Sequence, residues 1–461
     1  MRNKAYHIFS RLAAIVAIGS LSLTSCKKFL EIGTPANAVS EEGAFADSAT
    51  ATSTVLTLYT QAANTNPQNT SVLFNVTKYG MMSADEAYYL TNSLWDNFRN
   101  NTLASGNDLQ GFWAAAYTNI GRTNYIITNL EAESKLTPTV RNQLLGEAKF
   151  WRAWHYFYLT SYFGAAPLVL NTDALTNAQL PRSTAADVYA QIVKDLTEAK
   201  AHLTDIYPSA ERARVNRKVA AAMLARVRFY QQNWPEAEKE AGEVLGTTGT
   251  YRLVNGMDSV FIRTSPEVIL QAANVTGVTS FGAEFIPAAS TPNVVLYDTL
   301  ARTFEPGDKR KAQWTRPITF SGKEYFYPYK YRVRAGTAAN EYAVMLRLAE
   351  MFLIRSEARA NQDRIGDAVD DINAVRQRAG INGLAKTIDK TTLLAALEHE
   401  RWVELFTEYG DRWLNLKRTG RADVVLPLIK PAYTATQKLY PLPTLELQAN
   451  PKLAPDNPGY N

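Results

Sequence analysis

The chain has 461 residues, with 46% hydrophobic and 20% charged side chains, which is the composition of an ordinary globular protein with a large core. Its formal net charge is +5, and Arg2, Lys4 and Arg11 supply three of these charges from a segment that we expect to be removed. The remaining charge of +2 argues against a nucleic-acid-binding protein, which needs a basic surface to neutralise several phosphates. The single cysteine excludes an intramolecular disulfide.

The N-terminus has the pattern of an export signal. A basic start is followed by an uncharged run at residues 12–23, which is too short to span a bilayer, since a transmembrane helix needs about 20 residues. The run ends at Leu23-Thr24-Ser25-Cys26, which resembles a bacterial lipobox. We therefore expect a lipoprotein signal peptide at residues 1–25, lipid on Cys26 and a tether at residues 26–40. An ordinary signal peptide followed by a chance cysteine is the alternative.

Helical patterns dominate the rest of the chain, which we predict to be a single domain at residues 41–461. A serine followed by two glutamates at residues 40–42 predicts the start of a first helix, which extends to about residue 63. Helical spacing of apolar residues then covers residues 108–245 and 341–420, and the second region opens with a helix at residues 341–360. Helix pairs of about 34 residues are typical of tetratricopeptide repeats, although the strict repeat consensus is not met. The expected fold class is mostly α, with degenerate tetratricopeptide-like repeats.

Two loop-rich insertions, at residues 64–107 and 246–340, interrupt the helical patterns. The first is rich in Asn, Thr and Ser and contains Gly80. The second includes plausible short strands at residues 268–272 and 325–331. Loops that combine amides, carboxylates and aromatic rings can hold a polar ligand, but they are also where long insertions accumulate.

The two insertions contain the candidate ligand-binding residues. A sugar can stack on a flat aromatic side chain, while amides and charged groups form hydrogen bonds with its hydroxyl groups. The candidates for stacking are Trp95 first, then Trp314 and Tyr297, and those for hydrogen bonding are Asp85, Asn97 and Arg99. Each ring has an alternative role as an anchor for its loop.

The segment at residues 398–420 has the densest pattern in the chain. Its large apolar residues recur every three or four positions and predict a buried amphipathic helix: Trp402, Leu405, Phe406, Tyr409, Trp413 and Leu416. Gly410 is expected to bend or end this helix. The charged residues between them are expected on the opposite face, in ion pairs three and four residues apart: Glu398, Glu400, Arg401, Glu404, Asp411, Arg412, Lys417 and Arg418.

This segment resembles the C-terminal motif ER..EL..EG.R..DLKR of the SusD/RagB family, with Asn415 in place of the usual aspartate. Residues 147–169, 346–358 and 440–460 resemble three further motifs of that family, and the residues that follow Cys26 resemble its lipoprotein start. The resemblance therefore covers nearly the whole chain after the signal peptide.

The resemblance implies a cell-surface lipoprotein of the outer membrane in Bacteroidetes, seated as a lid on a SusC-like TonB-dependent transporter. Such a protein captures a nutrient, with an oligosaccharide or polysaccharide as the first candidate, and delivers it to the transporter. In this family the irregular segments form the binding surface while the repeats face the partner, and starch-binding members have a tryptophan in the insertion that corresponds to the one containing Trp95. A peptide ligand and a helical scaffold that binds only protein are the alternatives.

The sequence contains no evident constellation of catalytic residues, so we expect no enzymatic activity, no cofactor and no metal. The four histidines are scattered, and the motifs His-Glu-x-x-His and Gly-x-Ser-x-Gly do not occur. The adjacent Asp85 and Glu86 are weak evidence for a glycosidase, which needs two carboxyl groups about 5 to 10 Å apart on either side of the scissile bond. A surface hydrolase is a minor alternative that a reducing-sugar assay would detect.

Overall fold

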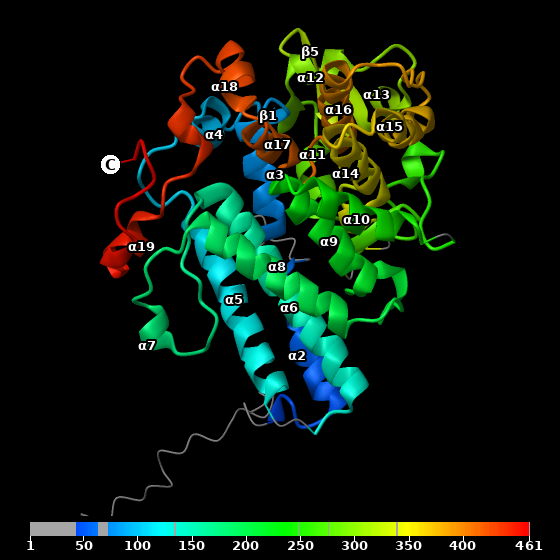
Figure 1. The fold of residues 1–461 in the computed structure, drawn as a ribbon. Helices are drawn as coiled ribbons and strands as arrows, with labels where there is room; N and C mark the ends of the chain where they lie inside the picture. Colours follow the sequence, from blue (N-terminus) through cyan, green and yellow to red (C-terminus); the bar gives the residue numbers. More distant parts are fainter. Residues whose placement is uncertain are drawn as a thin grey trace, which may run out of the picture.

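The computed structural model describes residues 43–62, 72–132, 135–247, 249–274, 276–337 and 340–460. This part of the chain is mostly helical, with three two-stranded sheets, and its long helices stack side by side (Figure 1). The architecture confirms the predicted fold class. The predictions for the signal peptide, Cys26, the tether and the helix start at residues 40–42 lie outside the described residues.

The first described helix is α2 (Ser48–Ala62). The carboxylate of Asp47 caps it, because this group accepts hydrogen bonds from the backbone nitrogens of Ala49 and Thr50 at 2.8 and 2.9 Å. The described residues 43–47 precede the helix as turns and bends. The helix therefore starts later than the sequence pattern predicted.

The insertion expected at residues 64–107 contains a buried helix, α3 (Val72–Ser83), in which every residue is buried. The expectation of loops throughout this insertion is therefore wrong. A helix that is buried on all sides carries no amphipathic stripe, and the polar Asn75 and Thr77 within α3 further conceal the pattern.

The repeat helices pack against one another in a nearly continuous series. Contacts connect α5 to α6, α6 to α8, α8 to α9, α9 to α10, α10 to α14, and α14 to both α15 and α16. Their bounds are α5 (Gln110–Glu131), α6 (Pro138–Phe163), α8 (Ala185–His202), α9 (Arg217–Tyr230), α10 (Trp234–Leu245), α14 (Leu348–Asn361), α15 (Ile365–Ala379) and α16 (Lys390–Leu405). The two helical regions predicted from the sequence thus form one stack.

Local sequence signals explain where several of these helices begin. Thr184, Asn216, Asn233 and Asp389 cap α8, α9, α10 and α16, since the side-chain oxygen of each accepts a hydrogen bond from a backbone N–H of the first turn. Pro235 lies in the first turn of α10, where a missing N–H is harmless.

One predicted strand is confirmed, and a predicted helix is partly wrong. β2 (Val268–Ala272) occupies the predicted residues and pairs antiparallel with β6 (Ala343–Arg347). The helix expected at residues 341–360 begins only at Leu348, because the five preceding residues form β6. A short apolar run fits either a buried strand or part of a helix, and pairing with a distant strand decides between them.

The other two sheets come from the insertions. β1 (Ala87–Tyr89) pairs antiparallel with β3 (Val294–Leu296), and β4 (Thr315–Phe320) forms a hairpin with β5 (Lys323–Pro328). β5 overlaps the strand expected at residues 325–331 and ends at its proline. The β1–β3 pair joins the two insertions, which the repeat helices separate in the sequence.

Short helices complete the fold. They are η3 (Ser93–Trp95), α4 (Asp96–Asn100), α7 (Ala174–Asn177), α11 (Ser280–Phe285), α12 (Asp298–Thr303), α13 (Lys309–Trp314), α17 (Asp411–Arg418), α18 (Ala422–Val425), η6 (Leu426–Leu428) and α19 (Thr444–Ala449). Figure 1 shows α4, β1, α12, α16, α17 and α18 at the upper end of the molecule, away from the lower ends of α5 and α6.

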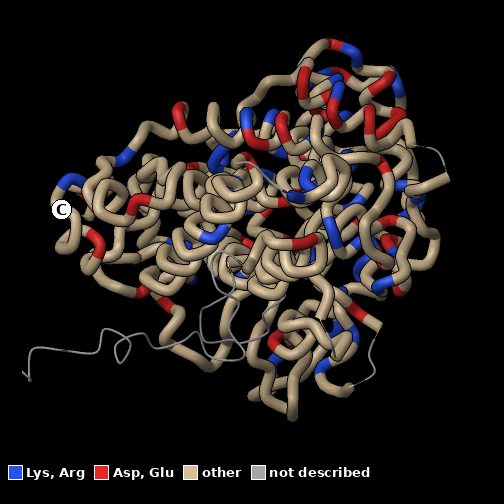
Figure 2. The backbone as a smooth tube through the Cα atoms, turned by 90° about the horizontal axis from the view of Figure 1, so that it is seen from below, with Lys and Arg blue, Asp and Glu red and all other residues tan. Residues whose placement is uncertain are grey.

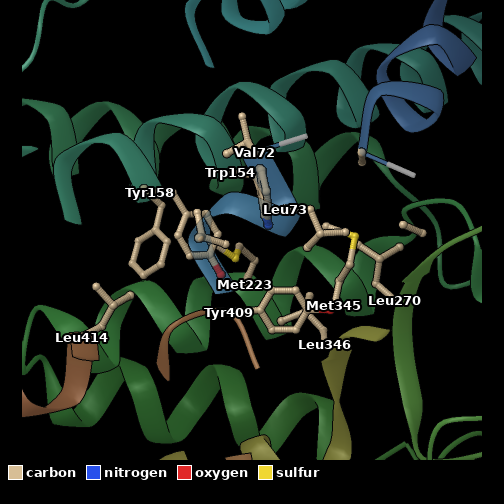
Figure 3. Packing of buried hydrophobic residues seen from close by; sticks show 14 of the residues in the cluster. Val72, Leu73, Trp154, Tyr158, Met223, Leu270, Met345, Leu346, Tyr409 and Leu414 are labelled. Carbon is tan, nitrogen blue, oxygen red and sulfur yellow. The ribbon is translucent and has the colours of Figure 1, made fainter. Parts of the chain in front are cut away.

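The segment between α16 and α17 lies in the core. Figure 3 shows Tyr409 near Met223 of α9 and Leu346 of β6, among other buried apolar side chains. Gly410, with a φ of +66°, precedes α17, but α16 already ends at Leu405, so the prediction that Gly410 bends or ends this helix placed its end too late. A Cβ atom on Gly80 of α3 would lie 2.3 Å from the Cα of Gly410, so the two backbones are in direct contact.

The charged side chains in the segment at residues 398–420 do not form the exposed polar face that the sequence pattern predicted. Glu400, Arg401, Glu404 and Arg412 are buried. Glu404 forms ion pairs with Arg310 at 2.9 Å and Arg347 at 2.5 Å, and also with Arg378. Figure 2 shows basic and acidic positions interspersed throughout the molecule. Buried charges require such partners because an isolated ion loses its hydration.

Candidate functional site

Trp314 is a core residue, so the expectation that it stacks on a ligand is corrected. Its side chain is 0% exposed, and its indole nitrogen donates a hydrogen bond to the backbone oxygen of Met257 at 2.8 Å. The ring also packs against Phe261 and Phe406, with centroids 5.6 and 6.5 Å away. Trp314 ends α13, and its side chain points inward although the surrounding sequence is rich in loops.

Asp85 is likewise unavailable as a free hydrogen-bonding group. Its two carboxylate oxygens accept hydrogen bonds from Nε and Nη2 of Arg412 at 2.7 and 2.9 Å. The expected role of Asp85 in hydrogen bonding to a ligand is therefore corrected to a buried ion pair.

Trp95 lies half-buried at the end of η3, with its ring against Tyr79, Tyr89 and Phe98. The ammonium of Lys78 lies 3.3 Å from the centroid of the Trp95 ring. Burial lowers the pKa of Lys78 to about 8, although the carboxylate of Glu284 opposes this shift.

Arg99 and Tyr297 lie together at Tyr88 of β1. The guanidinium of Arg99 lies 3.9 Å from the centroid of Tyr88, and the Tyr297 ring packs on Tyr88 at 4.8 Å. The Tyr297 hydroxyl donates a 3.4 Å hydrogen bond to the backbone oxygen of Arg99, and burial raises the pKa of this tyrosine. Asn97, on α4, is exposed. We call Trp95, Asn97, Arg99 and Tyr297 the Trp95 surface. Arg99 and Tyr297 meet at Tyr88, Trp95 packs on the adjacent Tyr89, and Asn97 lies between Trp95 and Arg99 in the sequence.

A separate open cleft of about 1050 Å³ lies along α16 and α17, and we call it the α16–α17 cleft. It is bordered by α12, the ends of α10 and α14, and the segment from α18 to η6. Its lining residues include Asp85, Trp234, Arg302, Glu357, Glu398, His399, Trp402, Arg412, Asn415, Arg418, Arg421 and Leu428. Apart from Asp85, none of these residues was proposed as a ligand-binding candidate from the sequence. Trp402 could have indicated the cleft, because it is an aromatic residue among the many charged residues of the segment at 398–420.

The charges of this cleft are arranged in short ion-pair chains. Glu398 accepts hydrogen bonds from Nη1 of Arg412 at 3.1 Å and from Nε of Arg421 at 3.2 Å. Glu357 accepts from Nη2 of Arg418 at 2.7 Å. The Arg412 guanidinium also lies 4.2 Å from the Trp402 ring centroid, which is within the range of cation–π contacts.

Three groups that could bind a metal ion, on Glu305, His399 and Glu400, lie within 4.8 Å of one another. Arg376 donates hydrogen bonds to Glu305 at 2.7 Å and to Glu400 at 3.1 Å. Arg310 also donates to Glu400 at 2.5 Å, so both carboxylates already pair with guanidinium groups, and the histidine Nε2 lies 3.0 Å from the Thr303 backbone oxygen. These contacts fit an ion-pair cluster better than a cation site.

Two family models match the chain. Residues 28–229 match a model described as "Starch-binding associating with outer membrane", and residues 305–460 match the model of the SusD family. The chain belongs to the SusD family. The two matched ranges include the repeat helices α5, α6 and α14 to α16 and the whole of the segment at residues 398–420.

Relatives and solved structures agree with this assignment. "SusD-like protein P2" from Formosa agariphila is 25% identical to this SusD-family chain over 433 residues, which covers 78% of this chain and 83% of that protein. The structure of a SusD superfamily protein from Bacteroides vulgatus aligns with a TM-score of 0.79 at 21% identity, over 90% of this chain and 99% of that one. The surface glycan-binding protein A of Bacteroides fluxus aligns with a TM-score of 0.75 at 20% identity, over 89% and 99% of the two chains. These structural likenesses show a shared fold.

Within the described part of the chain, no helix combines enough length with enough apolar character to cross a bilayer.

Proposed function

We propose that this SusD-family protein captures a glycan at the cell surface and delivers it to a TonB-dependent transporter in the outer membrane. The observation that carries the proposal is the half-exposed ring of Trp95, flanked by the exposed Asn97 and by Arg99, in a protein of this family. Two proteins of the same fold support the ligand class: a "Laminarin binding SusD-like protein", with a TM-score of 0.75, and the surface glycan-binding protein A.

Capture at the Trp95 surface is noncovalent, with no reaction and no cofactor. A pyranose stacks on the exposed part of the Trp95 ring, and the Asn97 amide and the Arg99 guanidinium form hydrogen bonds with its hydroxyl groups. Tyr297 holds the backbone of Arg99 through its hydroxyl and so positions this guanidinium. Because the ring packs on Tyr79, Tyr89 and Phe98, stacking costs little side-chain entropy.

Replacement of Trp95 by alanine tests this proposal. We expect Trp95→Ala to weaken glycan binding at least about tenfold, which corresponds to about 1.4 kcal/mol. The measurement is affinity electrophoresis and calorimetry of the full chain, purified in detergent, against laminarin, other neutral glycans and a set of peptides. The matched control is Leu94→Ala, because Leu94 is 79% exposed in the same turn and contributes no ring.

Three results would count against the proposal. Unchanged glycan affinity in Trp95→Ala would place the ligand elsewhere. Binding of peptides but of no glycan would favour the peptide-capturing alternative. Release of reducing ends during incubation would indicate a hydrolase.

A further inference from the structure

The α16–α17 cleft is large enough for a short oligosaccharide, since small-molecule sites commonly occupy about 300 to 1,000 Å³. Two half-buried tryptophans line it, Trp402 of α16 and Trp234 at the start of α10. The cleft therefore offers aromatic faces as well as charged groups, and none of the residues of the Trp95 surface lines it.

Several hydrogen-bond donors in the cleft wall have no partner among the described residues. The side chain of Arg418 is only 5% exposed, and its Nε has no hydrogen-bond partner among the described residues. The indole nitrogen of Trp402 is also buried without a partner in the described structure. Arg421 donates from Nε to Glu398, while its two terminal nitrogens form no hydrogen bond with the described part of the chain and its side chain is 46% exposed.

The acidic groups of the cleft are already engaged. Each of the three lining carboxylates accepts hydrogen bonds from a lining arginine: Asp85 from Arg412, Glu398 from Arg412 and Arg421, and Glu357 from Arg418. Arg302 is a fourth arginine at the border, 81% exposed, and its nearest carboxylate is 3.7 Å away on Asp298, which does not line the cleft. Every lining carboxylate of the cleft thus has an arginine partner, whereas, within the described structure, N–H groups of Arg421 and Arg302 are free to bind an acceptor.

We propose that the α16–α17 cleft is a second ligand site, selective for anionic oligosaccharides that carry carboxylate or sulfate groups. Such a ligand brings the negatively charged acceptors that Arg421 and Arg302 lack, and charge-assisted hydrogen bonds to guanidinium groups are about twice as strong as neutral ones. Sugar rings stack on Trp402 and Trp234. The aromatic faces favour a glycan over an acidic peptide. The site extends the proposed glycan capture, but its residues and its charge preference differ from those of the Trp95 surface.

Binding of a matched acidic and neutral pair tests the proposal. The probes are tetragalacturonate and the neutral tetrasaccharide obtained by reducing its carboxyl groups, measured by calorimetry on the full chain in detergent. We expect the acidic probe to bind at least about tenfold more tightly than the neutral one at low salt, and this preference to shrink as added salt screens the exposed guanidinium groups.

Variants locate the site. Arg421→Gln should weaken tetragalacturonate binding about tenfold and Arg421→Lys less, whereas Trp95→Ala should leave it unchanged. The matched control is Arg364→Gln, because the side chain of Arg364 is 47% exposed, also pairs with carboxylates, and does not line the cleft.

Several outcomes would overturn this inference. Equal affinity for the acidic and neutral probes, no binding of tetragalacturonate, or tighter binding of a tetraglutamate peptide would each do so. Loss of tetragalacturonate binding in Trp95→Ala but not in Arg421→Gln would assign the acidic ligand to the Trp95 surface. Failure of the proposed capture function appears separately, as neutral-glycan binding that Trp95→Ala does not change.

Discussion

Three buried guanidinium groups meet at the carboxylate of Glu404. This carboxylate accepts hydrogen bonds from Arg310, Arg347 and Arg378. Burial alone would raise the pKa of this carboxyl group, but the three guanidinium groups outweigh it and hold the pKa well below its ordinary value. Such a cluster gives little net stability over an apolar core, yet removing Glu404 takes one of the carboxylate partners from each of three arginines, whose remaining partners are Asp308, Glu267 and other carboxylates.

The substitution Glu404→Gln is expected to lower the free energy of unfolding by about 3–5 kcal/mol, because it leaves three buried guanidinium groups without their shared anion. Urea denaturation followed by circular dichroism measures this. Glu324→Gln is the control, since Glu324 is exposed on β5 and should change stability by less than about 0.5 kcal/mol. A similarly small change in the free energy of unfolding at both positions would show that the ion pairs of Glu404 are not needed for stability.

At the scale of elements, the backbone of α3 is in direct contact with the backbone of the glycine that precedes α17. A Cβ on Gly80 would meet the Gly410 Cα at 2.3 Å and the Tyr162 hydroxyl at 2.7 Å. That hydroxyl donates a 2.6 Å hydrogen bond to the Val76 backbone oxygen. A buried helix of the first insertion is thus fixed against the C-terminal motif, and it also contacts α4, which carries Asn97 and Arg99 of the Trp95 surface.

Gly80→Ala is therefore expected to destabilise the protein by about 1–3 kcal/mol through overpacking, in spite of alanine's higher helix propensity. Gly121→Ala is the matched control within a helix, because a Cβ there meets no atom within 4 Å and should stabilise α5 by up to about 1 kcal/mol. Thermal melts show whether each substitution raises or lowers the stability of the protein. Equal stabilisation by both would disprove the close contact.

At the scale of the whole molecule, a stack of repeat helices supports both candidate sites at one end (Figure 1). The Trp95 surface depends on pairing of β1 with β3, and the α16–α17 cleft depends on α12 from the second insertion and on the helices of the C-terminal half. Neither site is contained in one continuous segment, so each requires the complete fold.

Attachment to the membrane is a prediction at this scale. Cys26→Ala is expected to move the protein from the outer-membrane fraction to soluble fractions or to block its maturation, since each buried CH₂ of a lipid chain contributes about 0.8 kcal/mol to membrane binding. Cell fractionation and immunoblotting measure this, with Ser22→Ala as a control in the same segment. A Cys26→Ala protein that stays fully in the membrane pellet would refute the lipid anchor.

The sequence by itself determined the features that depend on neighbouring residues. Helical spacing, capping residues such as Asn233 and Asp389 and the apolar run of β2 are all local, so they were predictable. The order of the C-terminal motifs also indicated the family, which the comparisons confirm.

Only the tertiary structure decided which charged and aromatic side chains are buried. Glu404 and Arg347 are 57 residues apart and Arg412 and Asp85 are 327 apart in the sequence, so no local pattern could pair them. Trp314 and Trp95 both lie in segments predicted as loops, yet one ring is in the core and the other half-exposed. The physical reason is that burial depends on the partners that the fold brings to each side chain, and these partners come from distant elements.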